Sequence, residues 1–124
     1  MNEPPVTVLI VDDEPPLLKM MSTYLRRLGF GVLTFDGTDA AWENLGDRAS
    51  GLEAAVLDLS MKGMSSIELG RRLLEANPQM HVIVASGYPA SLEELEAAGP
   101  GRVKFLHKPF TPDALAACVR RARK

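Results

Sequence analysis

Short apolar runs alternate along this chain with longer segments of helical period, and this alternation constrains the fold more than any other feature. The runs cover residues 6–11, 32–35, 54–57, 82–85 and 103–106. The first run is interrupted only by Thr7, as expected of a strand buried on both faces. Strands that alternate with helices indicate an open parallel sheet with helices on both sides. We therefore predict an α/β fold with a doubly wound, five-stranded parallel sheet.

Cap signals precede four of the predicted helices. They are Thr38 or Asp39, the capping box of Ser65 and Glu68, a second capping box of Ser91 and Glu94, and Thr111. In a capping box the serine oxygen accepts a backbone N–H of the first turn, and the acidic side chain reaches back to the serine N–H. These signals place helices between the apolar runs.

Length and composition narrow the class of protein. The 124 residues fit one domain spanning 1–124, and a hydrophobic fraction of 46% with 24% charged residues is typical of globular proteins. A net charge of -2 argues against direct nucleic-acid binding. We expect no membrane segment, since no apolar run reaches 18 residues and the start lacks a signal-peptide pattern. The single cysteine, Cys118, suits a reducing compartment, so we expect the cytoplasm.

Reactive side chains stand at the ends of four predicted strands. Asp12 and Asp13 follow the first strand, Asp58 ends the third, Ser86 the fourth, and Lys108 follows the fifth. The carboxyl ends of parallel strands form one edge, where open α/β sheets bind ligands. Asp and Ser also end strands as ordinary turn residues, so each position alone is weak. Together they predict one site.

Three carboxylates at one edge repel one another, by about 4 kcal/mol per pair at a 4 Å separation in an effective dielectric of 20. Either one carboxyl group keeps its proton, or a hard divalent cation such as Mg²⁺ binds, and the cation is the better fit. With a cation present, Asp58 is free to attack phosphorus as a nucleophile. Lys108 then balances phosphoryl charge, and the Ser86 hydroxyl donates to a phosphoryl oxygen.

Four segments, "VLIVDDE" (8–14), "AVLDLSMKGM" (55–64), "VIVASGYP" (82–89) and "KFLHKPF" (104–110), resemble response-regulator receiver domains of two-component signalling. The resemblance spans nearly the whole chain and implies a flavodoxin-like sheet of order 2-1-3-4-5. It implies phosphorylation of Asp58 by a histidine kinase or a histidine phosphotransfer protein. Mg²⁺ would be bound by Asp13, Asp58 and the Ser60 backbone carbonyl, with Asp12 acting through a metal-bound water.

The same resemblance implies a phospho-acceptor switch, not an enzyme, apart from self-phosphorylation from small phosphodonors and autodephosphorylation. Ser86 would move toward the phosphoryl group and Phe105 would turn inward, changing the face of the fourth helix, fifth strand and fifth helix for a downstream protein target. Phe105 is also compatible with ordinary core packing. Pro109 would follow a cis peptide bond, and Ser60 and Tyr88 would tune water access. We expect a monomer or a weak dimer.

Departures from the family pattern leave alternatives open. Lys62 stands where the family usually has proline, and Ser65-Ser66 where it often has Asp-Gly. These substitutions are compatible with a phosphorylation-independent protein-binding module that kept the fold. A dehalogenase-like Mg²⁺-dependent phosphatase would need a second aspartate two positions after its nucleophile, where this chain has Ser60. The complete set of reactive residues favours the phosphorylated receiver.

Overall fold

A computed structural model describes residues 5–122, except for the side chains of residues 46–48 and 122. Its single sheet is parallel throughout and has the order β2-β1-β3-β4-β5, which confirms the predicted fold class and strand order. The strands are β1 (Val6–Val11), β2 (Gly31–Phe35), β3 (Ala54–Asp58), β4 (His81–Ser86) and β5 (Val103–His107). Most strands extend one or two residues beyond the apolar runs, because ladder hydrogen bonds also include the polar residues at their ends.

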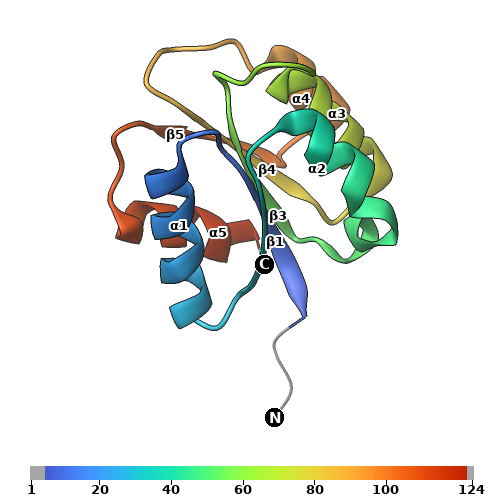
Figure 1. The fold of residues 1–124 in the computed structure, drawn as a ribbon. Helices are drawn as coiled ribbons and strands as arrows, with labels where there is room; N and C mark the ends of the chain where they lie inside the picture. Colours follow the sequence, from blue (N-terminus) through green and yellow to red (C-terminus); the bar gives the residue numbers. More distant parts are fainter. Residues whose placement is uncertain (1–4, 123–124) are drawn as a thin grey trace.

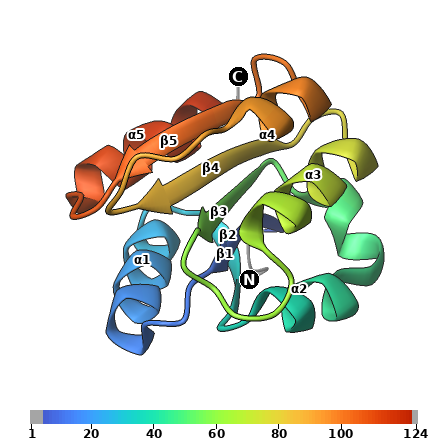
Figure 2. The ribbon, with the colours of Figure 1, turned by 90° about the horizontal axis from the view of Figure 1, so that it is seen from above.

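Helices cover both faces of the sheet. They are α1 (Pro15–Arg27), α2 (Thr38–Leu45), α3 (Ser66–Ala76), α4 (Glu93–Ala98) and α5 (Pro112–Ala122), with a 3₁₀ helix, η1 (Gly46–Gly51), after α2. Figure 1 shows α1 and α5 on one face and α2, α3 and α4 on the other, and Figure 2 shows the same layers from above. Among residues 5–122, no helix is long and apolar enough to cross a membrane.

The interior strand β1, which lies between β2 and β3, shows why its apolar run is uninterrupted. Val8 and Ile10 belong to the core beneath α1 and α5, whereas Leu9 and Val11 belong to the core beneath α2, α3 and α4. All four side chains are at most 1% exposed. Successive side chains of a strand point to opposite faces, so a strand covered on both sides needs apolar residues at every position.

One predicted capping box is half formed and the other is wrong. Ser65 caps α3, since its hydroxyl accepts the Glu68 N–H at 3.0 Å, but the Glu68 carboxylate pairs with Arg72 at 2.8 Å. A guanidinium is a stronger donor than the backbone amide that the carboxylate would otherwise bind. The Ser91 hydroxyl accepts from Glu93 at 3.5 Å, and α4 begins at Glu93 without a side-chain cap.

Asn77 joins α3 to the segment before β3, at the end of the sheet opposite the carboxyl ends of the strands. Its buried side-chain amide donates to the carbonyls of Ala49, Ser50 and Leu52 at 3.0, 3.2 and 2.8 Å. Its side-chain oxygen accepts the Gln79 N–H at 2.8 Å. This one side chain therefore bonds backbone groups of two segments, the one before β3 and the one after α3.

We expect Asn77→Ala to lower the free energy of unfolding by about 2 kcal/mol, because buried carbonyls lose their donor without gaining water. Urea denaturation measures this change. Asn44→Ala is the matched control: its amide bonds only the Ala40 carbonyl on the exposed face of α2, so its loss should stay within about 0.5 kcal/mol. Equal losses in the two variants would contradict this account of Asn77.

Candidate functional site

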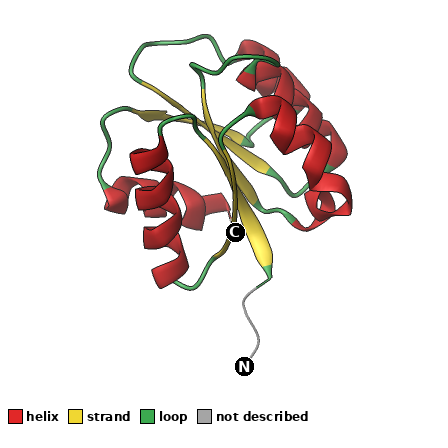
Figure 3. Cartoon of the chain, in the orientation of Figure 1, coloured by secondary structure: helices red, strands yellow, loops and turns green. Residues whose placement is uncertain are grey.

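Three carboxylates meet at the carboxyl edge of the sheet. Asp12 and Asp13 follow β1 and Asp58 ends β3, and one oxygen from each lies within 4.8 Å of the others. Asp12 and Asp58 are 1% and 4% exposed, whereas Asp13 is exposed. In Figure 3 the loops that follow β1, β3 and β4 lie at the same end of the sheet. The structure thus brings together the acidic residues that the sequence nominated.

Lys108 reaches into this cluster from the segment after β5. Its Nζ lies 3.1 Å from Asp12 Oδ2, 3.1 Å from Asp58 Oδ1 and 3.3 Å from Glu14 Oε2. Its backbone N–H donates to the Ser86 carbonyl at 2.8 Å, which ties the segment to β4. The peptide bond between Lys108 and Pro109 is cis, as the resemblance implied.

Burial and the neighbouring charges change two pKa values at this site. Burial raises the pKa of Asp12, with a contribution from the Asp58 charge, and hydrogen bonds from the Glu14 N–H and from Lys108 offset only part of this. Burial lowers the pKa of Lys108, but its hydrogen bonds to Asp12 and Asp58 outweigh burial, so the net direction is upward. A raised carboxyl pKa means that the folded chain loses stability as the pH rises above the ordinary value of 3.8. Because the ionised form of Asp12 is destabilised in the folded chain, a cation that binds next to it is stabilising.

The oxygen donors of the cluster fit a hard divalent cation. Three carboxylates and one ammonium carry a formal net charge of -2 when ionised, which an ion such as Mg²⁺ would balance. Mg²⁺ is held in proteins by one or two carboxylates while it keeps several waters. Exposure of Asp13 leaves space for those waters on the solvent side.

The carboxylate cluster does not include the other nominated residues. Ser86 is 5% exposed, and its Oγ accepts the Tyr88 N–H at 3.1 Å. Tyr88 is 76% exposed, and Ser60 is exposed in the loop after β3. Phe105 is 36% exposed, with its ring centroid 6.4 Å from that of His107. Phe105 is therefore a surface residue in this structure, and the alternative that it packs in the core is excluded.

Sequence reasoning missed four residues near the site. They are Glu14, Thr38, Asp39 and Ser66. Glu14 directly follows Asp12 and Asp13 in the sequence, so its contact with Lys108 could have been predicted. The predicted cap at Thr38 or Asp39 is wrong, because α2 begins at Thr38 and a cap residue precedes the first helical residue. The Thr38 hydroxyl instead donates to the Met64 carbonyl in the loop after β3. No sequence signal pairs these two positions, which lie 26 residues apart.

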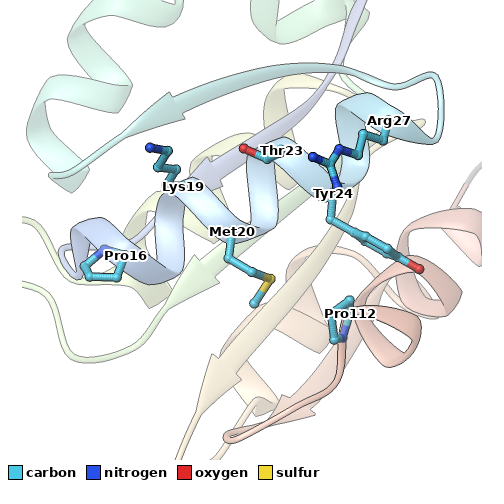
Figure 4. Close-up of a pocket in the computed structure, with 7 residues that line it drawn as sticks. All are labelled: Pro16, Lys19, Met20, Thr23, Tyr24, Arg27 and Pro112. Atoms are coloured by element: carbon cyan, nitrogen blue, oxygen red, sulfur yellow. The ribbon is translucent and has the colours of Figure 1, made fainter.

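Two of the hollows beside α1 bear on the site. One, of about 450 Å³, lies between α1 and the start of α5 and holds none of the nominated residues. Figure 4 shows its lining of Pro16, Lys19, Met20, Thr23, Tyr24, Arg27 and Pro112. The other, of about 330 Å³, is lined by Glu14, Leu17, Lys108, Pro109 and Phe110. This second hollow opens beside Lys108, so a partner group can approach the cluster there.

Comparisons with known proteins agree with this geometry. The sequence model of the family described as "Response regulator receiver domain" matches residues 8–120. The chain is 31% identical over 124 residues to the response regulator protein TmoT of Ectopseudomonas mendocina, covering 100% of this chain and 56% of that protein. It is 30% identical over 115 residues to the transcriptional regulatory protein FixJ of Bradyrhizobium diazoefficiens, covering 93% and 55%.

A solved structure shows the same likeness. The BeF3-activated DrrB receiver domain matches with a TM-score of 0.78 at 27% identity, covering 95% of this chain and 97% of that chain. The chain spans only about half the length of the two relatives, TmoT and FixJ.

Proposed function

This chain belongs to the response regulator receiver domain family, and from that premise we propose that Asp58 is its phosphoryl acceptor in a Mg²⁺-dependent reaction. A receiver is a phospho-acceptor switch of two-component signal transduction. The observation that carries the assignment is the meeting of Asp12, Asp13 and Asp58 within 4.8 Å, with Lys108 bonded to two of them.

The proposed step transfers a phosphoryl group from a phosphohistidine of a histidine kinase or a phosphotransfer protein. An oxygen of Asp58 forms the new bond to phosphorus, the P–N bond breaks, and its electron pair returns to the imidazole, which takes up a proton. Lys108, already 3.1 Å from Asp58, balances the charge of the transferred group. Mg²⁺, when bound, would offset part of the negative charge on the phosphoryl oxygens.

The ligand set proposed for Mg²⁺ comprises Asp13, Asp58 and the backbone carbonyl of Ser60, with Asp12 bound through a water. Asp12 suits this indirect role, since its Oδ1 already accepts the Glu14 N–H at 2.9 Å. Its other oxygen contacts Lys108. Small phosphodonors then serve as alternative substrates, and a water can later hydrolyse the aspartyl phosphate, with Ser60 and Tyr88 controlling its access.

The proposed switch runs through Ser86 and Phe105. The Ser86 hydroxyl accepts the Tyr88 N–H, which leaves its proton for a phosphoryl oxygen. If Ser86 moves toward that oxygen, Phe105 can leave its 36% exposed position for the space behind it. Phosphorylation shifts this equilibrium only by the difference in stabilisation between the two states. The α4, β5 and α5 face would then bind a downstream protein.

We also propose a compartment, an oligomeric state and a class of partner for the switch. We place it in the cytoplasm as a monomer or weak dimer that contacts proteins and does not itself bind nucleic acid. A phosphorylation-independent binding module gains no support from the site, since the three aspartates, Ser86 and Lys108 are all present.

Metal removal tests the proposed reaction. With acetyl phosphate and Mg²⁺, intact-protein mass spectrometry should detect one added phosphoryl group per chain. Treatment with EDTA should abolish the uptake, because the carboxylates and the donor repel without a cation, and excess Mg²⁺ should restore it. Equal uptake with and without EDTA would contradict the proposed reaction.

A further inference from the structure

The loop of residues 59–65, between β3 and α3, is fastened to the start of α2. Thr38 is fully buried, and its hydroxyl lies 2.5 Å from the Met64 carbonyl and 3.3 Å from the Lys62 carbonyl. A hydroxyl has one proton, so the shorter contact to Met64 is the main bond and Lys62 shares it. A loop without regular structure thus gains a fixed point inside the protein.

A second contact from α2 holds the same part of the loop. Asp39 Oδ2 accepts the Met64 N–H at 3.3 Å. Gly63 has a φ of +83°, and a Cβ at this position would overlap the Asp39 carboxylate. Only a glycine tolerates both this backbone conformation and this close approach. Thr38 therefore binds the C=O of Met64, and Asp39 binds its N–H.

Ser66 binds Asp58, the residue immediately before the loop. Its side chain is 1% exposed, and its hydroxyl donates to the backbone carbonyl of Asp58. Ser60 lies two residues after Asp58 and two residues before Lys62. Because each trans peptide unit has a fixed length and only two soft dihedral angles per residue, anchors this close leave Ser60 few positions.

We propose that Thr38 is a positioning residue for the acidic site: by holding Lys62 and Met64 it fixes the loop from which Ser60 presents its carbonyl to the cation. This inference rests on the proposed function, which makes the Ser60 carbonyl a ligand. It explains how the chain keeps an ordered loop with Lys62 at the position where the family usually has a conformationally restricted proline.

Affinity for Mg²⁺ separates this role from simple stabilisation. Thr38→Val keeps the side-chain shape and removes the hydroxyl, whereas Thr38→Ser keeps the hydroxyl. By isothermal titration calorimetry with MgCl₂, we expect Thr38→Val to bind Mg²⁺ about tenfold more weakly, and Thr38→Ser to stay within about twofold of the unaltered chain. Asn77→Ala is the control, since it should lose stability at the other end of the sheet and keep its Mg²⁺ affinity.

Unchanged Mg²⁺ affinity in Thr38→Val, or an equal loss in Asn77→Ala, would overturn the positioning role while leaving the proposed function intact. No Mg²⁺ binding by the unaltered chain would instead overturn the proposed function, and the positioning role with it. If Thr38→Val does not fold, the exposed Asp39 decides: Asp39→Ala should weaken Mg²⁺ binding, and Asp39→Asn, which keeps an oxygen acceptor, should bind as the unaltered chain does. Equal affinity in these two variants would also overturn the proposal.

Discussion

An Asp58→Asn variant will take up no phosphoryl group from acetyl phosphate and Mg²⁺ under conditions in which the unaltered chain takes up one. The amide keeps the size and position of the side chain at the end of β3 but removes the charged oxygen that attacks phosphorus. It also removes one of the three carboxylates of the cluster. Intact-protein mass spectrometry measures the uptake directly.

Asp36→Asn is the matched control for this prediction. Asp36 is an exposed carboxylate that directly follows β2, at the same edge of the sheet but outside the cluster. Its variant should take up one phosphoryl group. Undiminished uptake by Asp58→Asn would place the acceptor on another side chain, and Asp12 and Asp13 would be the first to examine.

Replacing Lys108 should lower the free energy of unfolding in the absence of metal. Lys108→Met removes the ammonium from Asp12 and Asp58, which are 1% and 4% exposed. Leaving buried charge without its partner is strongly destabilising, but the Lys108 side chain is 17% exposed and water can partly replace it. We expect a loss of about 2 kcal/mol in EDTA by urea denaturation.

Added Mg²⁺ should restore most of that stability, because a cation that binds only the folded chain stabilises it by mass action. Lys19→Met is the control: it changes an exposed lysine of α1 and should alter stability by less than about 0.5 kcal/mol in either condition. If Lys108→Met were as stable as the unaltered chain in EDTA, Lys108 would not be compensating the carboxylates.

The fold and the acidic cluster could be predicted because both depend on local patterns. The β-branched run that ends at Val11 marks a strand buried on two faces, and Asp12 and Asp58 mark where two strands end. Parallel strands place their carboxyl ends at one edge, so neighbouring strands bring those residues together without any knowledge of long-range contacts.

What escaped prediction depends on contacts between distant segments. Thr38 was expected to cap α2, but it is the first residue of that helix, and its hydroxyl donates to the Met64 carbonyl, 26 residues further along the chain. Ser91 failed as a capping box because α4 begins at Glu93. The exposure of Phe105 depends on how β5 is covered by its neighbours, which an apolar run does not show.

Calorimetric titration of the unaltered chain with Mg²⁺ tests the central claim most directly. If Asp12, Asp13 and Asp58 share one divalent cation, the titration will saturate at one Mg²⁺ per chain, and a variant carrying Asp12→Asn and Asp13→Asn will show no saturable binding. Absence of binding by the unaltered chain, or equal binding by the double variant, would contradict the claim that this cluster is a metal-dependent phosphoryl site.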